Sequence, residues 1–126
     1  MTGELRILLV DDEQIVRDTL GDYLTDCGYR VCTAEDGMAA SSILQAVTFD
    51  LVLADVRMPG LDGLALLEQL RTHDQDTPVV MMTGHGDAQM DSEAELRGAS
   101  GFLLKPVRLV DLDDLIRRLI GEGEKR

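Results

Sequence analysis

The sequence contains no tryptophan, only two tyrosines and two phenylalanines, and only two cysteines among its 126 residues. A core built from this chain must therefore be aliphatic, and a hydrophobic content of 44% excludes disorder over most of its length. The two cysteines, Cys27 and Cys32, lack the close pairing and nearby histidines of a zinc or redox site. The length is that of one domain, which we expect over residues 1–121, with 122–126 as a polar tail or the start of a linker.

Positive charge is also scarce, because 12 Lys+Arg stand against 24 Asp+Glu and leave a formal charge of −12. Such a chain is repelled by phosphate backbones and anionic lipid surfaces, so we expect no direct nucleic-acid binding and no membrane association. No apolar run approaches the roughly 20 residues of a membrane span, and the N-terminus lacks the features of a signal peptide. These absences favour a cytoplasmic protein.

Short apolar runs alternate with helical periods along the chain. Near-continuous apolar runs predict strands over 5–10, 29–34, 51–54, 79–82 and 102–104, as in a parallel sheet covered on both faces. Apolar stripes predict helices over 16–27, 39–47, 63–71, 87–97 and 109–119, of which 87–97 has the weakest apolar face. The repeated strand-helix unit indicates the α/β class. We expect a flavodoxin-like, five-stranded parallel sheet in the order 2-1-3-4-5 with helices on both faces.

Polar residues stand at the ends of four of these strands. The first predicted strand is followed by Asp11 and Asp12, the third by Asp55, the fourth by Thr83 and the fifth by Lys105. Each has an ordinary structural explanation: aspartates can cap a helix or begin a turn, a threonine can simply end a strand, and a lysine can be solvated.

Taken together, the same residues predict a binding site. Neighbouring strands lie about 4.8 Å apart, so the first and third strands would bring Asp11, Asp12 and Asp55 together. Two carboxylates about 4 Å apart repel by roughly 4 kcal/mol at a surface-like dielectric, so the cluster favours a cation. Its oxygen ligands suit Mg²⁺. Lys105 and the Thr83 hydroxyl would supply a charge and a donor to a phosphoryl group.

Four stretches carry a family resemblance, and they occur in order at the predicted strand ends. They are LLVDDE at 8–13, DVRMPGLDG at 55–63, MTGHGD at 82–87 and FLLKP at 102–106. The chain resembles the receiver domain of two-component response regulators over nearly its whole length. Residues 57–60 and 83–87 are most similar to receivers of nitrogen-regulatory and nodulation-type transcriptional regulators.

The resemblance implies a phosphorylation-switched signalling domain. Asp55 would accept a phosphoryl group from a sensor histidine kinase or phosphotransfer protein. Asp12, Asp55 and the backbone carbonyl of Arg57 would ligate Mg²⁺, with Asp11 acting directly or through water. Such a domain catalyses its own phosphorylation and dephosphorylation, and it is not a conventional turnover enzyme.

The remaining implied roles concern the phosphoryl group and the readout. Thr83 and Lys105 would hold phosphoryl oxygens, the Lys105–Pro106 bond would be cis, and Phe102 would be the aromatic switch residue. The fourth helix, fifth strand and fifth helix would contact an output domain or partner, and phosphorylation could produce a homodimer. The chain would be a stand-alone receiver or, as we favour, part of a larger regulator or hybrid kinase.

The sequence departs from the family pattern in two places. Val107 stands where an aromatic residue is common, and the fourth predicted helix carries Asp91, Ser92 and Glu95 where relatives are apolar.

Three other functions are compatible with an acidic α/β domain, and the sequence argues against each of them. A Mg²⁺-dependent phosphatase with an aspartyl nucleophile would show an Asp-x-Asp signature and a cap insertion, for which 126 residues leave no room. A flavin module would offer backbone donors and hydroxyls, where this chain offers Asp11, Asp12 and Glu13. A degenerate receiver would lack key side chains, all of which are present here.

Overall fold

The chain folds around one parallel sheet, in a computed structural model that describes residues 4–84, 92–95 and 97–121. The strand order is β2-β1-β3-β4-β5, and all four neighbouring pairs are parallel, which confirms the predicted topology. The strands are β1 (Arg6–Val10), β2 (Arg30–Ala34), β3 (Leu51–Asp55), β4 (Val79–Thr83) and β5 (Gly101–Leu104).

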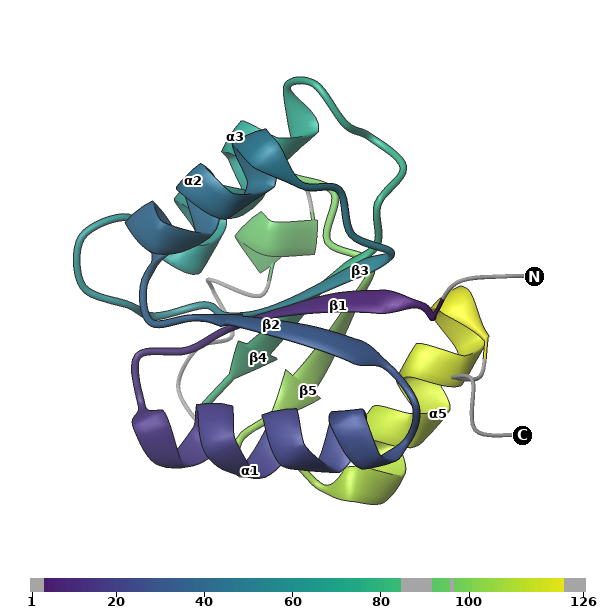
Figure 1. The fold of residues 1–126 in the computed structure, drawn as a ribbon. Helices are drawn as coiled ribbons and strands as arrows, with labels where there is room; N and C mark the ends of the chain where they lie inside the picture. Colours follow the sequence, from purple (N-terminus) through teal and green to yellow (C-terminus); the bar gives the residue numbers. More distant parts are fainter. Residues whose placement is uncertain (1–3, 85–91, 96, 122–126) are drawn as a thin grey trace.

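Helices cover both faces of this sheet. They are α1 (Gln14–Asp26), α2 (Gly37–Ala46), α3 (Gly63–Arg71) and α5 (Leu109–Ile120). Figure 1 shows α2 and α3 on one face and α1 and α5 on the other. Among the described residues, no helix is both long enough and apolar enough to cross a bilayer.

The alternation of side chains along the strands produces two apolar cores. Leu8, Val52 and Met81 belong to the core beneath α2 and α3, whereas Leu9 and Leu53 belong to the core beneath α1 and α5. Every residue of β3 and β4 is buried, which explains why both strands are apolar up to their last residues, Asp55 and Thr83. The edge strands β2 and β5 are partly exposed, as expected for strands with one neighbour.

Aspartate caps set the starts of two helices. The Asp36 side chain accepts a hydrogen bond from the Ala39 backbone N–H at 2.8 Å, so α2 begins at Gly37, two residues before the predicted start. Asp62 caps α3 in the same way. The N-cap residue of α1 is Glu13, and it makes no side-chain capping bond. Neither Asp11 nor Asp12 therefore occupies the N-cap position of α1.

The predicted fourth helix lies mostly outside the described residues. Within it, residues 92–95 are helical, and Ala94 is fully buried in the core beneath α2 and α3. Arg97 forms ion pairs with Glu93 at 3.0 Å and with Glu68 of α3 at 3.9 Å. The predicted tail at 122–126 also lies outside the described residues.

Candidate functional site

Three aspartates meet at the carboxyl ends of the central strands β1 and β3. Asp11 follows β1 and is completely buried, while Asp55 ends β3 and is 6% exposed. Asp12 is exposed beside them, and each of the three offers an oxygen atom within 4.8 Å of the others. The predicted juxtaposition of these acids is therefore present in the structure.

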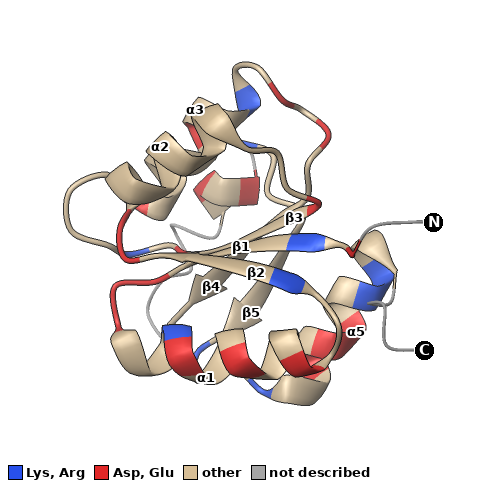
Figure 2. Cartoon of the chain, in the orientation of Figure 1, with Lys and Arg blue, Asp and Glu red and all other residues tan. Residues whose placement is uncertain are grey.

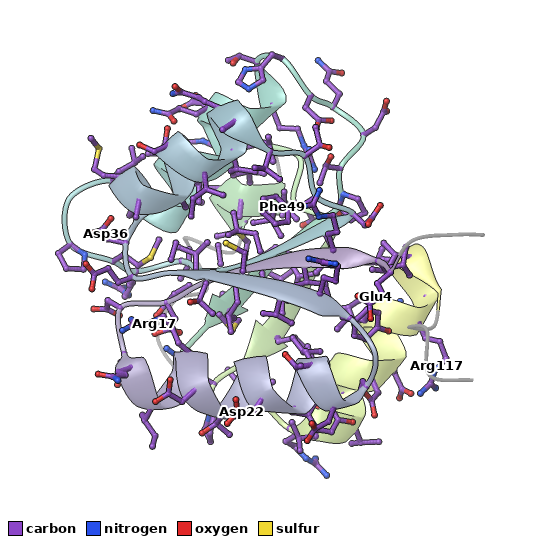
Figure 3. The ribbon with its side chains drawn as sticks, viewed as in Figure 1. Glu4, Arg17, Asp22, Asp36, Phe49 and Arg117 are labelled. Carbon is purple, nitrogen blue, oxygen red and sulfur yellow. The ribbon has the colours of Figure 1, made fainter. Side chains whose placement is uncertain are left out.

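Backbone groups fix the two buried carboxylates. The Glu13 N–H donates to Asp11 Oδ1 at 2.9 Å, and the Arg57 N–H donates to Asp55 Oδ1 at 3.1 Å. The Arg17 guanidinium, at the start of α1, donates to the Asp11 carbonyl at 2.6 Å, and Figure 3 shows it near the β1–α1 loop. Both acids are thus held with their second oxygens available to other partners.

The second oxygens bind the ammonium group of Lys105. Lys105 Nζ lies 2.8 Å from Asp55 Oδ2, 3.1 Å from Asp11 Oδ2 and 3.2 Å from Glu13 Oε1. The sequence predicted Lys105 only as a contact for a phosphoryl group. In the structure it contacts two of the three aspartates and already neutralises part of their charge.

Burial and hydrogen bonding shape the titration of this cluster. Burial raises the pKa of the Asp11 carboxyl, and hydrogen bonds from Glu13 N–H and from Lys105 oppose that rise. Burial alone would lower the pKa of Lys105, but its hydrogen bonds to Asp55 and Asp11 outweigh burial and raise it. The lysine is consequently a cation at neutral pH.

The remaining predicted residues lie around this centre. Thr83 is buried at the end of β4, beside β3, and its carbonyl accepts a hydrogen bond from the Lys105 backbone N–H at 2.7 Å. The Lys105–Pro106 peptide bond is cis, as the family resemblance implied. Phe102 is half-buried on β5 and packs against the core beneath α2 and α3.

The donor set fits Mg²⁺. The ion prefers oxygen ligands, keeps several waters and is usually bound by one or two carboxylates. Asp12 and Arg57 line an open depression beside the cluster together with Met58, Pro59 and Asp62, so one side of the acids is accessible to solvent. A cation and its waters have room in this depression beside Asp12, whereas Lys105 contacts Oδ2 of Asp11 and Oδ2 of Asp55.

An apolar groove adjoins the site. It is lined by residues from α1 and from the loop after β5: Ile15, Val16, Thr19, Leu20, Lys105, Pro106 and Val107. Ile15 is 71% exposed, which is unusual for a large aliphatic side chain. Sequence reasoning missed this groove and the Glu13–Lys105 contact. Two signals were available in the sequence. One was an isoleucine shortly after the acidic motif, and the other was a glutamate where a helix usually has a shorter capping residue.

Comparisons with known proteins agree with this geometry. The sequence profile described as "Response regulator receiver domain" matches residues 7–117. The transcriptional regulatory protein FixJ of Bradyrhizobium diazoefficiens is 37% identical over 124 residues, which cover 98% of this chain and 60% of FixJ. Both sequence and structure therefore point to receivers.

Two solved structures have the same fold. NtrX from Brucella abortus has a TM-score of 0.86 and 35% identity, covering 94% of this chain and 27% of that one. The chemotaxis protein CheY4 of Vibrio cholerae has a TM-score of 0.88 and 31% identity, covering 94% of this chain and 100% of that one. FixJ and NtrX confirm the predicted similarity to nitrogen-regulatory and nodulation-type regulators. The chain spans only 60% of FixJ and about a quarter of NtrX.

Proposed function

This chain belongs to the response regulator receiver domain family, and from that premise we propose that it is switched by phosphorylation of Asp55 by a histidine kinase. One observation supports this most strongly: Asp55 is a nearly buried carboxylate at a strand end, 2.8 Å from a lysine ammonium and beside two further acids. A carboxylate placed there can react with a phosphorus atom while fixed charges stabilise the transferred oxygens.

The reaction is a phosphoryl transfer between two nucleophiles. An Asp55 carboxylate oxygen attacks the phosphorus of a phosphohistidine, the P–N bond breaks, and the imidazole nitrogen keeps its electron pair and takes a proton from solvent. Lys105 moves a hydrogen bond from Asp55 to a phosphoryl oxygen, and the Thr83 hydroxyl donates to another. Catalysis is then mainly positioning and neutralisation of charge.

Mg²⁺ would be held by Asp12, Asp55 and the Arg57 carbonyl, with Asp11 acting directly or through water. When bound, it neutralises phosphoryl oxygens and orients them for in-line attack. Of these residues, Asp12 and Arg57 line the depression that opens to solvent, where the ion would enter, while Asp11 and Asp55 lie buried beside it.

The apolar groove next to Lys105 offers a docking place for the phosphohistidine partner. The groove is continuous with the site, because Lys105 lines both. Acidic residues continue along α1, where Asp18, Asp22 and Asp26 are exposed (Figure 2). A partner that fits would present apolar side chains to the groove and basic side chains to α1.

Readout would involve the surface of β5 and α5. Leu104, Leu109 and Val110 are exposed there, at 56%, 41% and 57%. Exposed aliphatic side chains on neighbouring elements favour contact with another protein surface. We assign this surface, together with the fourth helix, to an output domain, a partner or a second copy of the chain.

A phosphorylation assay tests the proposal. The protein is incubated with Mg²⁺ and acetyl phosphate, and its intact mass is measured with and without excess chelator. We expect one added phosphoryl group in the presence of Mg²⁺ and none for Asp55→Asn. Equal uptake by Asp55→Asn, or uptake that chelator leaves unchanged, would contradict the proposal.

A further inference from the structure

Glu13 occupies a position that helix capping does not explain. It is the N-cap residue of α1, a place that favours Ser, Thr, Asp or Asn, and its side chain makes no capping bond. Its carboxylate instead lies 3.2 Å from Lys105 Nζ, across 92 residues of sequence. The glutamate side chain is long enough to reach past the start of the helix, which the shorter capping residues are not.

The backbone of Glu13 is held firmly. Its N–H donates to Asp11 Oδ1 at 2.9 Å, and its carbonyl accepts the first hydrogen bonds of α1 from Val16 and Arg17. The carboxylate therefore extends from a fixed point at the rim of the site, with its side chain 58% exposed.

Lys105 has three N–H donors, and the structure gives it three carboxylate acceptors. Of these, Asp55 would become the acyl phosphate and Asp11 would contribute to the metal site. Glu13 is the acceptor that phosphoryl transfer leaves unchanged. A lysine side chain has several rotatable bonds, so an ammonium released by its other partners would lose its place unless one contact persisted.

We propose that Glu13 is a positioning residue, whose carboxylate holds the Lys105 ammonium at Asp55 while the phosphoryl group is transferred. The inference rests on the proposed function of Asp55. Glu13 acts through Lys105 and does not touch the reacting atoms.

Three variants of Glu13 distinguish positioning of Lys105 from a simpler effect, in which the negative charge of Glu13 repels an anionic phosphoryl donor. Glu13→Gln keeps the reach and an acceptor oxygen but loses the charge, Glu13→Asp keeps the charge but loses the reach, and Glu13→Ala loses both. If Glu13 holds Lys105 in place, the wild-type protein should be phosphorylated fastest and Glu13→Gln more slowly, with Glu13→Asp and Glu13→Ala the slowest and equal to each other. Charge repulsion alone predicts that Gln and Ala are both faster than Glu and Asp.

The rate is measured with acetyl phosphate at saturating concentration in Mg²⁺. We expect Glu13→Ala to be slower by about threefold to fivefold, the range that a partly exposed ion pair supports. The control is Asp76→Ala, which removes the same charge from an exposed position in the loop between α3 and β4, away from the carboxyl ends of the strands, and should react at the wild-type rate.

A second measurement needs neither metal nor donor. The sequence contains only two lysines, Lys105 and Lys125, so selective isotope labelling of lysine side chains gives two NMR signals, which Lys105→Arg assigns. In the metal-free protein, Glu13→Ala should shift and narrow the Lys105 signal, whereas Asp76→Ala should leave it in place. Melting temperature should not change with Glu13→Ala, because no capping bond is lost.

The outcomes are distinct. The predicted rate order together with a displaced Lys105 signal supports the proposal. An unchanged Lys105 signal in Glu13→Ala, or faster phosphorylation of both Gln and Ala, overturns it. Absence of phosphoryl uptake by the wild-type protein would overturn the proposed function of Asp55, and with it the part of Glu13 in transfer, even if the Lys105 signal still responds.

Discussion

Replacing Lys105 with methionine should destabilise the fold in a way that depends on pH. The substitution keeps a chain of similar length and removes the ammonium that lies 2.8 Å from Asp55 and 3.1 Å from Asp11. Asp11 is completely buried and Asp55 nearly so, and each would be left without its cationic partner. Glu13 is largely exposed, so the loss of its contact with Lys105 adds little to the loss of stability.

The size of the effect follows from the burial. Unit charges about 4 Å apart attract by about 4 kcal/mol at an effective dielectric constant of 20, and removal of one partner of a buried pair typically costs 3–5 kcal/mol. Because the Lys105 side chain retains 20% exposure, we expect the lower end, about 3 kcal/mol at neutral pH. For a domain of this size that corresponds to a fall of roughly 10 °C in melting temperature.

The loss of stability in Lys105→Met should depend on pH in a definite direction. Burial already places the pKa of Asp11 above its ordinary value, and loss of Lys105 would raise it further. A carboxyl with a raised pKa destabilises the fold above that pKa, and the penalty is relieved as the pH falls towards its unfolded value of about 3.9. The deficit of Lys105→Met should therefore shrink between pH 7 and pH 5.

Urea unfolding at the two pH values measures this deficit. Lys105→Met/Asp11→Asn should recover part of the lost stability, because it removes a buried charge left without its partner. Lys125→Met, the same substitution at the other lysine of the sequence, should behave like the wild type. A Lys105→Met protein as stable as the wild type at pH 7, or a deficit that is equal at both pH values, would refute the reasoning.

Three further outcomes are expected. Mg²⁺ at about ten times its dissociation constant should stabilise the fold by about 1.4 kcal/mol, and Asp12→Ala should lose most of this rise in a thermal-shift assay. Gly63→Ala should lower the free energy of unfolding by about 1–3 kcal/mol, measured with urea, and should slow phosphorylation, because the added Cβ would press on the Asp55 carbonyl. At Gly21 an added Cβ would make ordinary contacts, so Gly21→Ala should stabilise α1 by up to about 1 kcal/mol. Hydrogen bonds from a nearby threonine lower the pKa of Asp74, so its stabilisation is present above its unfolded pKa and is lost as the pH falls through the folded pKa. Asp74→Asn should thus cost about 1 kcal/mol at pH 7, and urea unfolding at successively lower pH should show this cost shrink once the pH is below the unfolded pKa.

Much of the sheet could be predicted because its central strands are buried on both faces. β1, β3 and β4 have nearly unbroken apolar sequences, and a polar residue stands at the end that faces the site: Asp11 directly after β1, Asp55 as the last residue of β3 and Thr83 as the last residue of β4. The starts of the helices were predicted less accurately than the strands. The pattern of apolar residues predicted a start at 39 for α2, but the Asp36 cap adds the turn at Gly37, which carries no apolar signal.

The reactive centre could be predicted from the period of two in a strand. Leu9, Leu53 and Leu103 face the core beneath α1 and α5, and the residues two positions later are Asp11, Asp55 and Lys105. Because side chains alternate between the two faces along a strand, all three side chains point to the same side of the sheet. The direct contact of Lys105 with Asp11 and Asp55 was not predicted, because Lys105 was assigned only to a phosphoryl group.

What could not be predicted depends on the conformations of long side chains. The contact between Glu13 and Lys105 joins two flexible side chains from distant parts of the chain, and no periodicity specifies it. The same holds for Arg71, whose guanidinium binds the Gly98 carbonyl at 2.9 Å and ties the end of α3 to the segment before β5. These contacts follow from the packing of the finished fold.

The central claim is that the phosphoryl group is attached to Asp55, and site mapping tests it directly. An acyl phosphate is reduced by borohydride to an alcohol, so a phosphorylated aspartate becomes homoserine, which peptide mass spectrometry can locate. After treatment with Mg²⁺ and acetyl phosphate, we expect homoserine at position 55 and at no other aspartate. Homoserine at Asp11 or Asp12, or none in a protein whose intact mass shows the added phosphoryl group, would contradict the account.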